Sequence, residues 1–507
     1  MSNKEVYMYP QKSSGLAVPK SMGVNSSEKK LCGLGYRTFL SLWSYPNLFQ
    51  KHKQVKELCD LLVVFENHII IFSDKDCAFG NSGDIKTDWI RWYKKAVLAS
   101  AKQLCGAKSW IKKCPDRICM DDKGKVDFPL KIEVNEKTEF HLVAVAHGAA
   151  DACKRYFGGG DGGLIITNDT FDINDREHCE PFHVGRVLPE QDTFIHVFDD
   201  SSYATVLEEL DTISDFVNYL SDKERLFLSD SVVSVAGENE LLAHHLSGMI
   251  DGCSTALYDL THENGKSGVI LIEEGLWDDL VVSLKYQKWK KQVEISYFWD
   301  SLLQKTFYFI ENGISLTTTP TIDAQSKLFQ YLAREDRFHR ATLSQSFLSF
   351  VKDMPDDFRG TRIIYSHENP TVCYVLFLLP RESYMNDEDY RKVRFDMLRD
   401  YCLIAKAEHP LVQMVIGVAH ESNEQTGSSE DFMTLDAGKW TAEDQEKATK
   451  LKEECIQKRL LGRRNYVGFS YNRTDSPNIR KMKGADRNKP CPCGSGKKYK
   501  KCCGTIS

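Results

Sequence analysis

The order of apolar and polar positions predicts a helix at the start of residues 26–110. Apolar side chains recur there at helical spacing, at Leu31, Leu34, Phe39 and Leu42. We expect this helix to begin near Glu28, with Ser26 or Ser27 as its N-cap. We expect it to end before Pro46, because proline disfavours helical geometry in the residue that precedes it.

Two runs rich in β-branched residues follow and predict a hairpin. They flank the polar residues 66–68, so strands are expected near 58–65 and 69–73. Thr87 is the expected cap of the next helix, and later apolar runs at 140–146 and 163–167 predict further strands. The apolar face of that helix is Ile90, Tyr93, Val97, Ala101 and Leu104.

The rest of the chain alternates apolar runs with helical patterns, which predicts a mixed α+β domain. The expected strands lie at 267–274, 361–366, 371–380 and 412–420. A polar segment follows, and Thr441 can cap a charged helix after it.

The length of 507 residues is too great for one core and favours two to four domains. The overall class is α/β in the mixed α+β sense. The expected units are a disordered tail at 1–27, a first domain at 28–180, the α+β domain at 181–420, a linker with the charged helix at 421–485, and a compact end at 486–507.

Composition narrows the class of protein. No run of about 18 apolar residues is present, which excludes a membrane-spanning helix, and residues 1–20 lack the apolar stretch of a secretory signal. Twelve of the 16 cysteines are scattered singly, as buried reduced thiols usually are. We therefore expect a cytoplasmic protein.

Charge is divided unevenly along the chain. Residues 480–507 hold nine basic residues and one acidic residue, a net charge of +8. The total is −6, so the other residues carry −14. A basic end on an acidic body indicates contact with phosphate or with an acidic protein surface.

The other four cysteines lie together in this basic end, at Cys491, Cys493, Cys502 and Cys503. Four thiolates suit tetrahedral zinc, and a short segment without a core can fold around the metal. A disulfide pair is the less favoured alternative, because nothing in the sequence points to an oxidising compartment.

The stretch "RNKPCPCGSGKKYKKCC" at 487–503 resembles the SEC-C motif, a zinc knuckle found at the C-terminus of the bacterial translocase ATPase and in many other bacterial proteins. The resemblance implies zinc held by the four cysteines. It also implies docking to an acidic protein partner, the ribosome or nucleic acid. A knob that only stabilises the chain end is the alternative.

Asp60 and Lys75 carry the candidate chemistry of the first domain. Asp60 lies early in the first hairpin strand and Lys75 where the second strand ends, so the two residues should meet at one end of the hairpin. A carboxylate there can hold Mg²⁺, and a lysine can orient or activate the attacking water. This is the chemistry of metal-dependent phosphodiester cleavage.

The arrangement resembles the PD-(D/E)XK nuclease superfamily, whose fold is restriction-endonuclease-like. The matching residues are Asp60 for the first carboxylate, Lys75 for the lysine and Glu28 for a glutamate on the first helix, with Lys102 and Gln103 on the following helix. The sequence departs from the motif at Ser73, where an acidic residue is expected. Asp74 or Asp76 is the candidate substitute, although strand alternation points Asp74 to the opposite face unless a bulge turns it.

Two functions follow. The first is a metal-dependent nuclease, with Asp60, Asp74, Lys75 and Glu28 as catalytic residues and Mg²⁺ as cofactor. The second is a non-catalytic zinc-binding adaptor with a degenerate nuclease-like domain.

Several features favour plain structural roles. Asp60 can pair with Lys56 or Lys75 as a strand-edge carboxylate. Trp89 and Trp92 are expected in the core rather than stacked on bases. The histidines His147, His183 and His196 lack ligand spacing and are expected to be structural or exposed.

Overall fold

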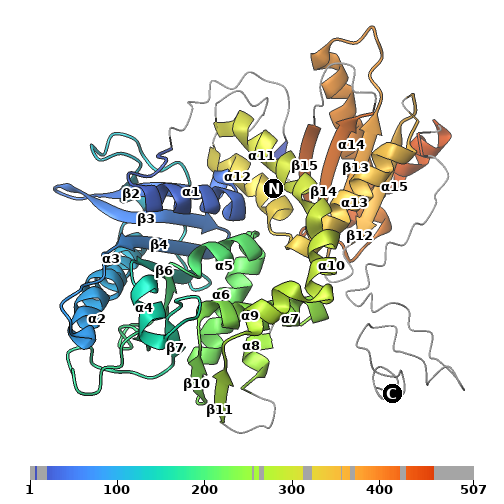
Figure 1. Cartoon of the computed structure of the whole chain (residues 1–507). Coiled ribbons are helices and arrows are strands. Elements are labelled where there is room, and N and C mark those ends of the chain that lie inside the picture. The colour runs from blue at the N-terminus through green and yellow to red at the C-terminus, as the bar shows by residue number, and fades with distance from the viewer. Residues whose placement is uncertain are drawn as a thin grey trace, which may run out of the picture.

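The chain folds into three β-sheets joined and covered by helices. A computed structural model describes residues 6–7, 20–253, 256–261, 268–311, 322–355, 357–365, 371–422, 430–458 and 460–461. Figure 1 shows the first sheet, in blue and teal, and the third sheet, in orange, on opposite sides of a group of yellow and yellow-green helices. The mixed α/β class with several sheets is therefore confirmed.

The first sheet has six strands. They are β2 (Ser44–Lys51), β3 (Val55–Phe65), β4 (His68–Asp76), β5 (Ile118–Cys119), β6 (Glu139–His147) and β9 (Ile195–Asp199). Their order is β5-β2-β3-β4-β6-β9. β2, β3 and β4 form an antiparallel meander, whereas β4, β6 and β9 run parallel. The predicted hairpin is β3–β4, with Leu61 opposite Phe72.

Helices cover both faces of this sheet. On one face lie α1 (Ser26–Phe39), α5 (Tyr203–Glu209) and α6 (Ile213–Phe227), and on the other α2 (Ile85–Tyr93) and α3 (Ala99–Lys113). Two neighbouring residues of β4 show the division. The Phe72 ring contacts Phe39 of α1 and Phe216 of α6, whereas the Ser73 hydroxyl donates to Gln103 of α3. Side chains on β4 therefore alternate between an α1/α6 side and an α3 side.

The first helix differs from expectation at both ends. Its N-cap is Asn25, whose side chain accepts from the Glu28 N–H, and it ends at Phe39 because Leu40 has a φ of 60°. Pro46 lies instead within β2. The expected caps Ser26 and Ser27 are the first two helical residues.

The helical segment after β4 also begins earlier than expected. Asp84, rather than Thr87, caps α2, and a π-helical turn at Lys94–Leu98 joins α2 to α3. Trp89 and Trp92 are buried and their rings stack 5.2 Å apart, which confirms their expected place in the core.

A small second sheet lies beside the first. Its strands, in spatial order, are β11 (Val269–Ile272), β10 (Val232–Val235), β7 (Ile165–Thr167) and β8 (His183–Val184). The helices near it are α4 (Ala150–Phe157), α7 (Glu238–Asp251), α8 (Ala256–Asp259) and α9 (Leu276–Val282).

The first sheet continues past residue 180, where we expected a domain boundary, because β9 pairs with β6. The division of the chain into separate domains stays a prediction.

The third sheet has five strands in the order β1-β15-β14-β13-β12. They are β1 (Val6–Tyr7), β12 (Gly360–Tyr365), β13 (Val372–Leu379), β14 (Met414–Glu421) and β15 (Glu430–Asp436). α14 (Asp387–Glu408) makes the crossover between the parallel strands β13 and β14, and α15 (Ala442–Gln457) packs on α14. Thr441 caps α15 as expected, through a capping box with Asp444.

Two strands of this sheet occupy segments in which we expected no regular structure. β15 lies in the polar segment after residue 420, and β1 lies in the expected tail. β15 contains buried apolar residues, including Phe432, Met433 and Leu435, and it is hydrogen-bonded to β14. The polar residues on either side of this short strand made the segment resemble a loop in the sequence.

The helices between the outer sheets are α10 (Leu284–Val293), α11 (Tyr297–Glu311), α12 (Ile322–Ala333) and α13 (Arg337–Asp353). One buried apolar cluster runs from Leu31 through these helices to Phe432, so the first and third sheets share a core. In the part of the chain that the structure describes, no helix is both long and apolar enough to cross a bilayer.

Candidate functional site

The start of β3 and the end of β4 meet at one edge of the first sheet. The Asp74 backbone N–H donates to Asp60 Oδ2 at 2.6 Å. Because β3 and β4 are antiparallel neighbours, Asp60 and Lys75 lie at the same end of the hairpin, and the Lys75 charge acts on Asp60.

Five polar residues gather here on the α3 side of the sheet. The Ser73 hydroxyl donates to Gln103 Oε1 at 3.2 Å, and Gln103 Nε2 donates to Glu57 Oε1 at 3.4 Å. Strand alternation places Lys75 on the same face as Ser73. We call Glu57, Asp60, Ser73, Lys75 and Gln103 the α3-side cluster.

At pH 7 the Asp60 carboxyl group is mostly protonated and therefore neutral. Burial above all, with a hydrogen bond to Glu57 and the Glu57 charge, raises its pKa to about 8 against the opposing effects of the Asp74 N–H and the Lys75 charge. Two carboxyl groups this close share a proton because both cannot ionise cheaply. A divalent cation would replace that proton, so the pair is suited to metal binding.

The cluster is open to solvent. Asp60 is 5% exposed, but Glu57 is exposed and Lys75 half-buried. Two carboxylates match the way Mg²⁺ is usually held in proteins, by one or two carboxylates with water and substrate phosphate completing its shell. The arrangement can therefore present a hydrated cation beside a lysine ammonium group.

Sequence reasoning missed Glu57, because regular alternation places residues 57 and 60 on opposite faces of a strand. The pairing of β2 with β3 shifts between Leu48 and Phe49, which lie opposite Cys59 and Glu57. One extra residue of β3, Leu58, therefore forms a bulge that turns Glu57 toward Asp60. A bulge cannot be read from the apolar pattern, since "VKELCDLL" carries no glycine or proline to mark it.

Asp74 lies on the other face of the sheet. Its Oδ1 accepts from the Ser27 hydroxyl at 2.9 Å and lies 3.4 Å from His147 Nε2. β4 keeps one unbroken register with β6 from His68 to Asp76, so no bulge turns Asp74 toward Asp60. Alternation places Asp76, which is exposed, on the same face as Asp74.

The surroundings of Asp74 form an ion-pair group. His147 Nδ1 lies 2.9 Å from Asp200 Oδ1. Burial favours the neutral imidazole, but hydrogen bonding and charge from Asp200 and Asp74 outweigh it and raise the pKa of His147 to about 9. The ring is therefore cationic at neutral pH and compensates the buried Asp74 carboxylate.

Glu28 is occupied at the start of α1. Its two carboxylate oxygens accept from the Val24 N–H at 2.7 Å and from Asn25 Nδ2 at 2.6 Å. These contacts are those of a helix cap. The structure thus brings Asp60 and Lys75 together and gives Asp74 and Glu28 other partners.

The four terminal cysteines, Cys491, Cys493, Cys502 and Cys503, lie outside the described residues, and their role as zinc ligands stays a prediction. Comparison with known proteins does bear on the segment that contains them. The family model for the SEC-C motif matches residues 487–505, which confirms that resemblance.

Short matches to curated SecA proteins support the same resemblance. The protein translocase subunit SecA of Trichlorobacter lovleyi is 42% identical over 64 residues, 12% of this chain and 7% of that protein. SecA 1 of Alkaliphilus metalliredigens is 70% identical over 33 residues (6% and 4%), and SecA of Geobacter metallireducens is 80% identical over 25 residues (5% and 3%). The chain thus spans less than a tenth of the length of these relatives.

No solved structure matches the chain, so the restriction-endonuclease-like resemblance of the first domain has no support from the comparisons. What they establish is local: this chain carries a SEC-C motif at residues 487–505, and that motif is a zinc-binding motif.

Proposed function

We propose that this protein is a metal-dependent nuclease that hydrolyses phosphodiester bonds in nucleic acid, with the SEC-C segment as its docking module. The observation that carries the proposal is the α3-side cluster. It combines Asp60, whose pKa is raised, with the neighbouring Glu57 carboxylate, a lysine and an orienting amide at one solvent-open end of the sheet.

Each residue of the cluster has a role in this proposal. Asp60 and Glu57 hold Mg²⁺, and the Asp74 backbone N–H fixes the orientation of Asp60. Lys75 orients the attacking water and opposes the charge that develops on the phosphate. Gln103 positions Glu57 through its amide.

The chain order around the cluster supports the resemblance that suggested the activity. A helix, an antiparallel meander, a second helical segment and a parallel strand come in the order α1, β2–β3–β4, α2–α3 and β6, with only the two-residue strand β5 before β6. Glu57 supplies the second carboxylate that the sequence lacks at position 73. It takes the place that we first gave to Asp74 and Glu28.

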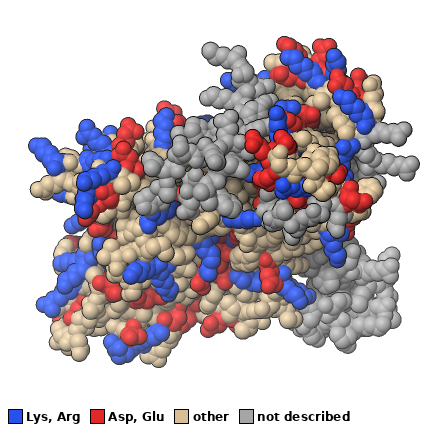
Figure 2. All heavy atoms as spheres, turned by 90° about the horizontal axis from the view of Figure 1, so that it is seen from above, with Lys and Arg blue, Asp and Glu red and all other residues tan. Residues whose placement is uncertain are grey.

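A non-catalytic adaptor is the second candidate. Ser73 provides no carboxylate, and the SEC-C motif is shared with SecA, which favours binding to a protein partner. Figure 2 shows Lys and Arg side chains mixed with Asp and Glu over the visible face, so that face offers no uniform positive field to a polyanion.

Cleavage assays separate the two candidates. The full-length protein is incubated with plasmid DNA, single-stranded DNA and RNA in Mg²⁺ or Mn²⁺. We expect Lys75→Ala, Asp60→Asn and Glu57→Gln each to lower the rate by about 10²- to 10⁴-fold. Lys56→Ala is the matched control, because Lys56 is an exposed lysine next to Glu57, and it should retain the parent rate.

Absence of metal-dependent cleavage by the parent, or a Lys75→Ala variant as fast as the parent, would refute the nuclease and leave the adaptor. Full activity of Glu57→Gln with loss in Asp60→Asn would refute the role given to Glu57.

A further inference from the structure

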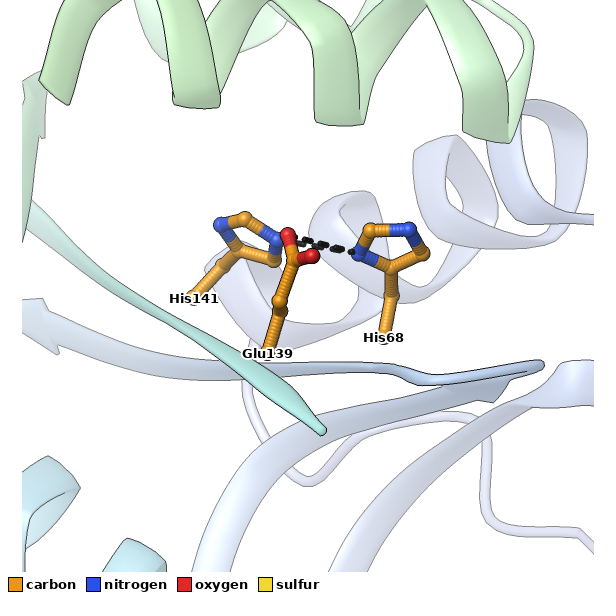
Figure 3. A group of neighbouring side chains, drawn as sticks. All are labelled: His68, Glu139 and His141. Carbon is orange, nitrogen blue, oxygen red and sulfur yellow. Dashed lines mark hydrogen bonds and ion pairs between the residues drawn. The ribbon is translucent and has the colours of Figure 1, made fainter. Parts of the chain in front are cut away.

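A second group of ligand-type side chains lies on the α1/α6 side of the first sheet, at the opposite end of β4. His68 begins β4 and stands directly opposite Glu139, the first residue of β6. His141 is two residues further along β6 and therefore on the same face as Glu139. Figure 3 shows the three side chains turned toward one another above the sheet.

The distances within this group suit a tetrahedral metal ion. His68 Nδ1 lies 3.3 Å from His141 Nε2 and 3.6 Å from Glu139 Oε2. Nitrogen and oxygen ligands bind zinc at about 2.0–2.2 Å, so two ligand atoms at a tetrahedral angle are about 3.3–3.5 Å apart. These two separations match a tetrahedral site, and all three ligand atoms lie within 4.8 Å of one another.

The tautomer of His141 is set by Glu224 of α6. Its carboxylate oxygen Oε1 lies within hydrogen-bond distance of both His141 and His196. An ionised carboxylate only accepts, so His141 Nδ1 (3.3 Å) and His196 Nε2 (2.9 Å) are the donors to Glu224 Oε1. The lone pair of His141 Nε2 then points toward His68.

This carboxylate behind a histidine is the usual support of a metal-bound imidazole, since it orients the ring and makes it more basic. His196 is fully buried and has its Nδ1 without a hydrogen-bond partner among the described residues. It bonds the same Glu224 oxygen as His141, so it holds the supporting carboxylate in place.

One side of the group is open. The His141 side chain is 3% exposed, whereas those of His68 and Glu139 are 22% and 55% exposed. A metal ion can therefore enter from solvent, and water can fill a fourth position, as in open rather than closed zinc sites.

The group is separate from the α3-side cluster. His68 lies seven residues before Lys75 on the same strand, a separation of about 23 Å at 3.3 Å per residue, and the two residues face opposite sides of the sheet. No known role of the SEC-C segment accounts for it either, because that segment brings its own four thiols.

We propose that His68, His141 and Glu139 bind one divalent cation of the Zn²⁺ type, with Glu224 and His196 as positioning residues. The metal-free alternative is an N–H···N hydrogen bond between the two imidazoles, which binds no cation.

Metal counting on the full-length chain tests the proposal. We expect the parent to retain two zinc ions after dialysis, and a Cys491→Ser/Cys493→Ser variant to retain one, measured by elemental analysis. Adding His68→Ala and Glu139→Ala should remove that last ion. Both residues are at least partly exposed, so their loss should leave the circular dichroism spectrum and the melting temperature of the metal-free protein nearly unchanged.

Two further variants sharpen the test. Glu224→Gln should weaken zinc binding about 10- to 100-fold without removing a ligand. His178→Ala should have no effect, because His178 forms an exposed histidine–carboxylate pair with Asp175 away from the group. Co²⁺ added to the variant without Cys491 and Cys493 should absorb without a thiolate charge-transfer band.

The proposal is overturned if the Cys491→Ser/Cys493→Ser variant retains no zinc at micromolar free metal. It is equally overturned if His68→Ala with Glu139→Ala leaves the retained ion in place. Neither result bears on cleavage at Asp60, so the fate of the proposed nuclease is decided separately.

Discussion

Binding of Mg²⁺ to the α3-side cluster should release a proton from the Asp60–Glu57 pair. With a pKa of about 8 at Asp60, about nine chains in ten carry that proton at pH 7, half at pH 8 and one in ten at pH 9. A metal ligand must be deprotonated. Binding should therefore release about 0.9 proton per chain at pH 7 and about 0.1 at pH 9.

The same shift sets the pH dependence of affinity. Below pH 8 the cation competes with the proton, so the apparent affinity for Mg²⁺ should fall about tenfold between pH 7 and pH 6, and it should level off above about pH 8.5. The stability of the metal-free protein should also depend on pH through Asp60. Its native state holds a proton that an unfolded aspartate loses near pH 4, so this group lowers the free energy of unfolding as pH rises from about 4 to 8.

Isothermal titration calorimetry of Mg²⁺ binding in several buffers measures this proton release. The observed binding enthalpy is plotted against the ionisation enthalpy of the buffer, and the slope gives the number of protons released per chain. Asp60→Asn should abolish the release at pH 7, whereas Glu443→Gln, at an exposed glutamate of α15, should leave it unchanged. A slope near zero at pH 7 while Mg²⁺ still binds would refute the reasoning, as would a slope that does not change between pH 7 and pH 9.

Two further predictions concern stability. Arg394 of α14 is fully buried and donates a 2.7 Å hydrogen bond to Asp431 of β15. Urea denaturation should therefore show that Arg394→Ala lowers the free energy of unfolding by about 3–5 kcal/mol, whereas Lys447→Ala, which breaks an exposed pair, lowers it by at most about 1 kcal/mol. Equal losses in the two variants would contradict this prediction. The raised pKa of His147 contributes stability that is complete below about pH 6.5 and lost as pH rises through about 9, so the fall in melting temperature between pH 6 and pH 9 should be smaller in His147→Gln than in the parent.

The sequence alone was sufficient to predict those helices and strands that form because of neighbouring residues in the chain. The β-branched runs around residues 66–68 predict β3 and β4, and Thr441 predicts the start of α15, because strand propensity and capping depend on neighbouring residues. The motif at 487–505 is likewise a short sequence signal. The convergence of Asp60 with the end of β4 followed from antiparallel pairing alone.

Tertiary structure decided the rest, because it depends on partners that are distant in the chain. The bulge in β3 arises from its pairing with β2, and it replaces Asp74 by Glu57 beside Asp60. The place of β9 in the first sheet, the strand β15 and the group of His68, Glu139 and His141 depend on pairing and packing between separate segments. The sequence alone determined which side chains could carry chemistry, and the folded sheet determined which of them face one another, since strand register and alternation assign each side chain to a face.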